Sequence, residues 1–193
     1  VSTARSVEII RKMKKKGIHI TCETCPQYFT LTEDEVLVQG SLARVNPPLR
    51  TAQDVKGIIA GLKDGTIDAI ATDHAPHSAE EKARPLVRAP SGMIGLETSL
   101  AITLTQLYHT GKMELPEIIR RMSTNPSDIL HLPKGRMSLG VDGDLTIFDP
   151  NEEWTVDPER FASKARNTPF GGWKVKGRVK YTIVKGRVIY RQA

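Results

Sequence analysis

The segment TIDAIATD, residues 66–73, restricts the possible folds more than any other part of the sequence. Its apolar residues fall on both faces of an extended strand, and not on one face only. A strand that is apolar on both faces is buried between helices, as in the parallel sheets of α/β proteins. The segment ends in Asp73, so the sequence predicts this carboxylate at the carboxyl end of a buried parallel strand.

Helical and extended patterns alternate around this strand, which predicts an α/β fold. Ser2 or Thr3 can cap the first helix, and Thr51 with Asp54 forms a capping box at a later one. The expected elements in chain order are a helix ending at Gly17, a strand at 18–23, a helix from Thr51 to Gly65, the strand at 66–73, a helix at 96–108, and shorter helices at 115–122 and 126–130.

The pattern changes beyond the segment LPKGRMSLGVDGD, where short strands joined by turns replace the alternation. The segments LTIFD, EWTV, VKYTIVKG and RVIY are each expected to form a strand, and Lys185-Gly186 is the expected tip of a hairpin. A boundary near 135–140 is therefore predicted, with one domain at 1–137 and a smaller β-rich domain at 138–193.

Composition indicates an ordinary globular chain, with 39% hydrophobic and 26% charged residues among 193. No apolar stretch approaches the ~20 residues of a membrane span, so we expect no membrane association and a cytoplasmic location. The chain begins at Val1, in what reads as the entry into a helix, so we expect it to be a piece of a longer protein.

A net charge of +6 raises the question of nucleic-acid binding. The basic run RKMKKKG at 11–17 fits the solvated carboxyl end of a helix, where cations complement the helix dipole. The basic residues near the carboxy terminus alternate with Val, Tyr and Ile, as the outward face of strands would. Without aromatic residues interleaved on one basic face, no nucleic-acid partner is expected.

The two cysteines, Cys22 and Cys25, form a C-x-x-C pair. A structural zinc site needs four ligands, and the chain has no second such pair. We therefore expect a structural role for both thiols, in a reducing compartment.

Asp73 opens the segment DHAPH, which also contains His74 and His77. The carboxyl ends of parallel strands are where α/β proteins build their active sites. A carboxylate there can bind a divalent metal or transfer protons, and nearby imidazoles can add ligands or hydrogen bonds. The competing interpretation is that Asp73 caps the next helix and that the histidines bind backbone groups.

Several motifs together resemble the bacterial-type dihydroorotases of the amidohydrolase superfamily. They are VNPPLR, DGTIDAIATDHAPHSAEEK, APSGMIGLETSL, STNPSDILHL, GVDGDLTIFDP and NTPFGGWKVKGRVKYTIVKGRVIY. The resemblance implies a metal-dependent (β/α)8 barrel with a small β-rich domain, of which this chain is the carboxy-terminal part. It also implies two zinc ions per full-length subunit, whose other ligands would lie upstream of Val1.

The resemblance implies a role for five residues. Asp73 would be both a metal ligand and the catalytic proton shuttle. Asn46, His77, Ser91 and Gly92 would contact the substrate. The implied reaction is the reversible hydrolysis of the ring amide of dihydroorotate to N-carbamoyl-aspartate in pyrimidine biosynthesis, by a possible homodimer or in association with other enzymes of that pathway.

One segment departs from the dihydroorotase pattern. Cys25-Pro26-Gln27-Tyr28 is closer to the hydantoinase and dihydropyrimidinase relatives, although those usually replace Asn46 and His77. A cyclic amide hydrolase of that type is therefore the alternative enzyme. A non-catalytic scaffold is the alternative outside the enzymes. The fragment alone is expected to bind zinc weakly and to lack activity.

Overall fold

The computed structural model describes residues 1–192, which form two compact units. The first unit comprises Val1–Ser99 and Thr155–Trp173, and the second comprises Leu100–Trp154 and residues 174–192. This division follows contacts and does not test the predicted domain boundary between 137 and 138, which stays a prediction.

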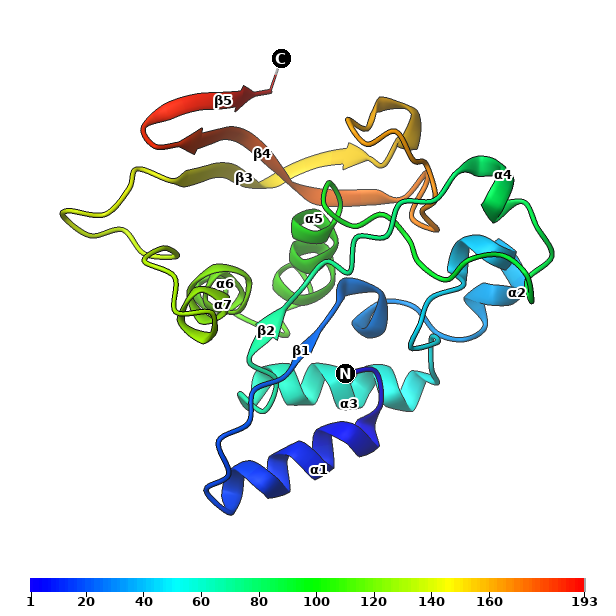
Figure 1. Ribbon diagram of the computed structural model, residues 1–193, viewed down its shortest axis with the longest axis horizontal. Helices are drawn as coiled ribbons and strands as arrows, with labels where there is room; N and C mark the ends of the chain where they lie inside the picture. Colours follow the sequence, from blue (N-terminus) through cyan, green and yellow to red (C-terminus); the bar gives the residue numbers. More distant parts are fainter. Residues whose placement is uncertain (193) are drawn as a thin grey trace. The chain divides into compact units, whose positions relative to one another are not determined.

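Helices α1 (Ala4–Lys15) and α3 (Ala52–Lys63) pack side by side in the first unit (Figure 1). The close approach depends on Gly57, because a Cβ there would lie 2.4 Å from the Cβ of Ala4. Thr3 and Thr51 cap the two helices, as predicted, by accepting hydrogen bonds from the N–H groups of Ser6 and Asp54.

Strands β1 (Glu23–Thr24) and β2 (Ala69–Ile70) follow these helices and pair in parallel. Both are shorter than the predicted strands at 18–23 and 66–73. Beyond the paired residues, β1 and β2 are joined by further backbone hydrogen bonds, such as that from the Ala71 N–H to the Thr24 carbonyl. Within residues 1–192, neither strand pairs with a third strand. Glu23 lies opposite Ala69, and Thr24 lies opposite Ile70.

The basic run at 11–17 is not simply a solvated helix end. The Lys14 ammonium lies 2.7 Å from an Asp68 carboxylate oxygen, and the Arg11 guanidinium lies 2.6 Å from Asp64. These pairs attach the end of α1 to the segment that leads into β2, so part of the predicted positive surface is neutralised within the chain.

Short helical turns complete the first unit. They include α4, whose Ser78 and Glu81 form a full capping box. Their bounds are η1 Pro26–Phe29, α2 Glu35–Gln39, η2 Gly40–Ala43, α4 Ala79–Lys82 and η5 Pro158–Arg160.

The second unit opens with two helical stretches in which α-helical and π-helical turns alternate. The predicted helix at 96–108 begins instead at Ser99, and just before it the N–H groups of Gly95 and Leu96 point at the His74 ring. The two predicted helices at 115–122 and 126–130 are one continuous stretch. The bounds are α5 Ser99–Thr103, η3 Leu104–Tyr108, α6 Leu115–Ile119, η4 Arg120–Thr124 and α7 Asn125–Ile129.

A three-stranded sheet in the order β3-β4-β5 completes the second unit (Figure 1). Its strands are β3 Leu145–Thr155, β4 Lys174–Val184 and β5 Arg187–Arg191. β4 and β5 are antiparallel around Lys185-Gly186, which confirms the predicted hairpin. The expected separate strands LTIFD and EWTV are one strand, and Pro150 is tolerated within it because β3 lies at the sheet edge. None of the helices within residues 1–192 is long and apolar enough to cross a membrane.

Candidate active site

Asp73 lies three residues beyond β2, at the carboxyl end of the strand, as predicted. Its backbone is left-handed, with a φ of 48°. Aspartate adopts this conformation more readily than most residues, because its short polar side chain can bond locally. The chain turns sharply here and leaves the Asp73 side chain exposed. This carboxylate is therefore free to meet a metal ion or a substrate.

Cys25 and Tyr28 lie close enough to Asp73 for its charge to affect them, and both have a raised pKa. Burial, reinforced by the negative charge of Asp73, raises the pKa of the Cys25 thiol to about 12. Burial also raises the pKa of the Tyr28 hydroxyl, with smaller contributions from Cys25 and Asp73. Tyr28 donates its hydroxyl hydrogen to the Pro47 carbonyl at 2.8 Å. Both groups are therefore poor proton acceptors at neutral pH.

Both thiols of the C-x-x-C pair have a raised pKa. The Cys22 thiol donates to the Thr66 carbonyl at 3.3 Å, and burial raises its pKa. A raised thiol pKa lowers the thiolate fraction that both redox chemistry and metal binding need. Across residues 1–192, no group of three or more His, Cys, Asp and Glu side chains could hold a metal ion.

His74 binds backbone groups. Its Nδ1 accepts hydrogen bonds from the N–H groups of Gly95 at 3.1 Å and Leu96 at 3.4 Å. Its main chain forms a parallel β-bridge with Met93. His74 therefore attaches the segment after β2 to the loop at 93–96, and the competing interpretation from the sequence holds for this histidine.

His77 lies against the Ser91-Gly92 turn, which brings together three of the predicted substrate contacts. Its Nε2 donates to the Ser91 carbonyl at 3.0 Å, and its Nδ1 lies 3.9 Å from a Glu81 carboxylate oxygen. The ring is therefore bonded to the loop through Nε2, and its Nδ1 faces the Glu81 carboxylate. Contact with a substrate carboxylate stays a prediction.

Ser91 and Gly92 are held by Arg44, from the segment that precedes VNPPLR. The Gly92 N–H donates to the Arg44 carbonyl at 2.8 Å, and the Arg44 Nε donates to the Ser91 hydroxyl oxygen at 3.3 Å. Asn46 follows two residues later, is exposed, and precedes a cis peptide bond to Pro47. The structure thus brings the Asn46 loop next to the Ser91-Gly92 turn. A role for Asn46 in substrate binding stays a prediction.

Two buried polar side chains in this cluster were missed from the sequence. Asn167 is 3% exposed, and its Oδ1 accepts from the His77 N–H at 3.1 Å. Its Nδ2 donates to the carbonyls of Ala75 at 3.0 Å and Gly92 at 3.1 Å. Lys82 is also 3% exposed, although its place in the charged run AEEK suggests a helix surface. No periodicity marks either residue as buried.

Comparison with known proteins was made on the whole chain. The profile of the Amidohydrolase family matches residues 2–189. A protein named Dihydroorotase from Acetivibrio thermocellus is 50% identical over 192 residues, which are 100% of this chain and 45% of that protein. A protein of the same name from Anaplasma phagocytophilum is 46% identical over 99% of this chain and 42% of its own length. The chain thus spans less than half the length of these relatives.

A similar result comes from solved structures. The L-hydantoinase (dihydropyrimidinase) of Arthrobacter aurescens superimposes with a TM-score of 0.93 at 31% identity, over 100% of this chain and 44% of that one. The dihydropyrimidinase of Brevibacillus agri superimposes with a TM-score of 0.92 at 27% identity, over 99% of this chain and 43% of that one. These matches confirm the predicted fold class, an α/β part of an amidohydrolase barrel with a small β-rich domain, and the resemblance to dihydroorotases.

Proposed function

Because the chain belongs to the amidohydrolase family, we propose that the full-length protein is a dihydroorotase. It would catalyse the reversible hydrolysis of the ring amide of dihydroorotate to N-carbamoyl-aspartate. The observation that carries this proposal is the similarity of the whole chain, at 46% and 50% identity, to two proteins named Dihydroorotase. The exposed Asp73 at the carboxyl end of β2 is the group in this chain that suits the reaction.

Asp73 is the proposed proton carrier. In the hydrolytic direction, the oxygen of water forms a bond to the ring carbonyl carbon, and the bond from that carbon to the ring nitrogen breaks. The proton lost by the water must reach the leaving nitrogen. A carboxylate at the strand end can accept that proton and then donate it to the nitrogen. The neutral Cys25 and Tyr28 beside it do not compete as bases.

The family implies a metal cofactor, and we propose two zinc ions per full-length subunit, as the resemblance suggested. The side chains in residues 1–192 do not fit a complete site, because no three potential ligands gather there. Asp73 is the one proposed ligand from this chain, and the others are assigned to the rest of the protein. The isolated chain is accordingly proposed to be inactive.

The proposed substrate contacts are Asn46, His77, Ser91 and Gly92. His77 is hydrogen-bonded to the Ser91 carbonyl at 3.0 Å, and Arg44 binds both Ser91 and Gly92. Asn46 lies two residues beyond Arg44. An anionic small molecule suits a site with an imidazole and backbone groups. No nucleic-acid partner is proposed, and the pairing of Lys176 with Glu153 and of Lys180 with Glu152 neutralises part of the basic segment near the carboxy terminus. A homodimer or an association with other pyrimidine-pathway enzymes, in the cytoplasm, remains part of the proposal.

A second candidate is a cyclic amide hydrolase of the hydantoinase or dihydropyrimidinase type. The superposition on the Arthrobacter aurescens enzyme and the segment Cys25-Pro26-Gln27-Tyr28 favour it. A spectrophotometric assay of the full-length protein with dihydroorotate and with dihydrouracil separates the two. Turnover of dihydroorotate alone supports the proposal, and turnover of dihydrouracil alone replaces it. Turnover of neither substrate favours a non-catalytic scaffold.

A further inference from the structure

Lys82 is a buried cation whose hydrogen-bond partners within residues 1–192 are all main-chain carbonyls. Its Nζ donates to the carbonyl of Gly92 at 2.9 Å and to that of Pro90 at 3.1 Å, with a longer contact of 3.5 Å to the carbonyl of Arg44. Burying a charge is costly unless hydrogen bonds replace its hydration. An ammonium has three donor hydrogens, and here three carbonyls converge on it. The three hydrogen bonds hold these carbonyls close to one another.

The carbonyls that Lys82 binds belong to the turn at 90–92. The Ser91 carbonyl between them accepts from His77, and the Gly92 carbonyl accepts from Asn167 as well as from Lys82. Three consecutive carbonyls are thus directed at side-chain donors from other segments. This fixes the orientation of the peptide planes in a turn that has no helix or strand of its own.

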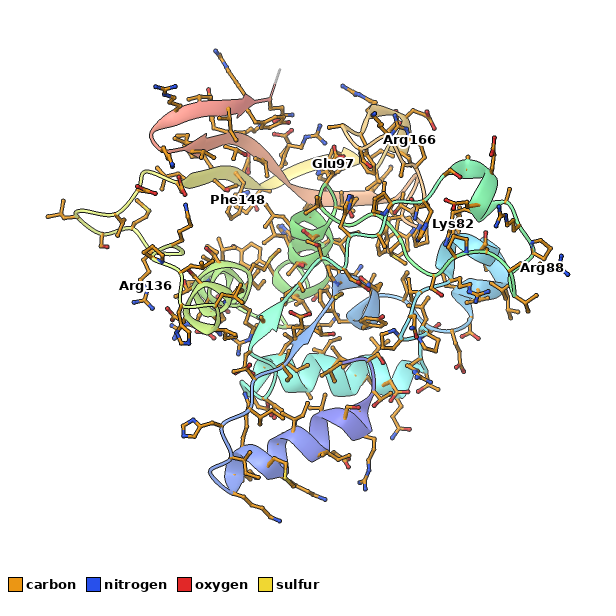
Figure 2. All side chains as sticks on the ribbon, viewed as in Figure 1. Lys82, Arg88, Glu97, Arg136, Phe148 and Arg166 are labelled. Carbon is orange, nitrogen blue, oxygen red and sulfur yellow. The ribbon has the colours of Figure 1, made fainter. Side chains whose placement is uncertain are left out.

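Both ends of Lys82 are anchored. The capping box of Ser78 and Glu81 orders the short helix α4 that carries it, and the Ser41 hydroxyl donates to the Lys82 main-chain carbonyl. In the same loop Arg88 is exposed and projects away from the structure, as Figure 2 shows. Lys82 is therefore a buried cation of this segment, and Arg88 is an exposed one.

We infer that Lys82 is a positioning residue. By binding the carbonyls of Pro90 and Gly92, it holds the backbone of residues 90–92 in the conformation in which Ser91 and Gly92 would contact the substrate. The part of this inference that concerns the substrate rests on the proposed function. Lys82 itself does not touch the reacting atoms. Its loss should loosen the turn and weaken substrate binding more than it slows the chemical step.

The test compares Lys82→Met with Arg88→Met in the full-length protein. Met keeps the length of the lysine side chain and removes its donors. We expect Lys82→Met to raise KM for dihydroorotate at least about tenfold, equivalent to ~1.4 kcal/mol, while kcat changes by less than about threefold. We expect Arg88→Met to leave both constants unchanged. Hydrogen exchange followed by mass spectrometry should show faster exchange confined to the peptide around 89–94 in Lys82→Met only.

If the Lys82→Met variant does not fold, the Lys82→Arg variant replaces it in the hydrogen-exchange test. It keeps a buried cation, but its planar head cannot place donors on the same three carbonyls, so a smaller loosening at 89–94 is expected. In whichever variant folds, unchanged exchange at 89–94, or a change spread evenly over the protein, overturns the inference. If the wild-type full-length protein does not turn over dihydroorotate, the proposed function is refuted, while local loosening at 89–94 in the variant still supports the positioning role.

Discussion

A Cβ atom at Gly92 would lie only 2.5 Å from the Cβ of Ala75 and 3.2 Å from the Nε2 of His77. Gly92 also has a φ of 134°, which side-chain-bearing residues rarely adopt. We expect Gly92→Ala to displace the turn and to reduce dihydroorotate turnover by about tenfold or more. Gly172→Ala is the matched control, because Gly172 has a φ of 79° and nothing within 4 Å of an added Cβ. Equal turnover by the two variants would contradict the claim that the turn has no room for a side chain at Gly92.

Asp54 gives a prediction for acid stability. Burial alone would raise the pKa of its carboxyl, but hydrogen bonds from the Ala4 N–H and from Thr51 lower that pKa below the ordinary value of 3.8. The ionised carboxylate thus stabilises the contact between α1 and α3 at neutral pH, and this stability is lost as pH falls through the lowered pKa. We expect Asp54→Asn to reduce the free energy of unfolding by about 1 kcal/mol at pH 7.

Urea unfolding across pH checks the sign of this effect. The difference between wild type and Asp54→Asn should be constant above about pH 5 and should shrink as the pH falls below 3.8. Glu80→Gln, at an exposed position of α4, is the control and should show little difference at any pH. A difference that grows on acidification would show that the Asp54 carboxylate is not the stabilising form.

The isolated 193-residue chain is expected not to hold zinc tightly. Protein zinc sites need three or four ligands, and residues 1–192 contain no group of three candidates. Native mass spectrometry with metal analysis should find little bound zinc on this chain and two ions on each full-length subunit. Two tightly held zinc ions on the isolated chain would refute the assignment of the remaining ligands to the rest of the protein.

Local patterns were enough to predict much of the fold. The caps at Thr3 and Thr51 and the hairpin at Lys185-Gly186 depend on neighbours in sequence, and the structure confirms them. Strand length depends on a pairing partner instead. For that reason the predicted strand at 66–73 is reduced to Ala69–Ile70, and the two strands expected around Pro150 merge into one.

The site was predictable only in part, because its support comes from distant segments. The sequence predicted Asp73 at the end of a strand, and the family resemblance implied that His77 and Ser91 contact the substrate. It did not indicate Asn167, which is 90 residues from His77 in sequence and accepts a hydrogen bond from its N–H. Lys82 was missed for a related reason, since its burial follows from carbonyls supplied by Arg44 and by the turn at 90–92.

Turnover of dihydroorotate by the Asp73→Asn variant of the full-length protein tests the central claim most directly. Asparagine is nearly the same size but cannot accept the proton of water and pass it to the ring nitrogen, so we expect kcat to fall by about a thousandfold. Asp34→Asn, which changes an exposed aspartate elsewhere in the first unit, should leave kcat unchanged. Turnover by Asp73→Asn at the wild-type rate would remove Asp73 from the mechanism.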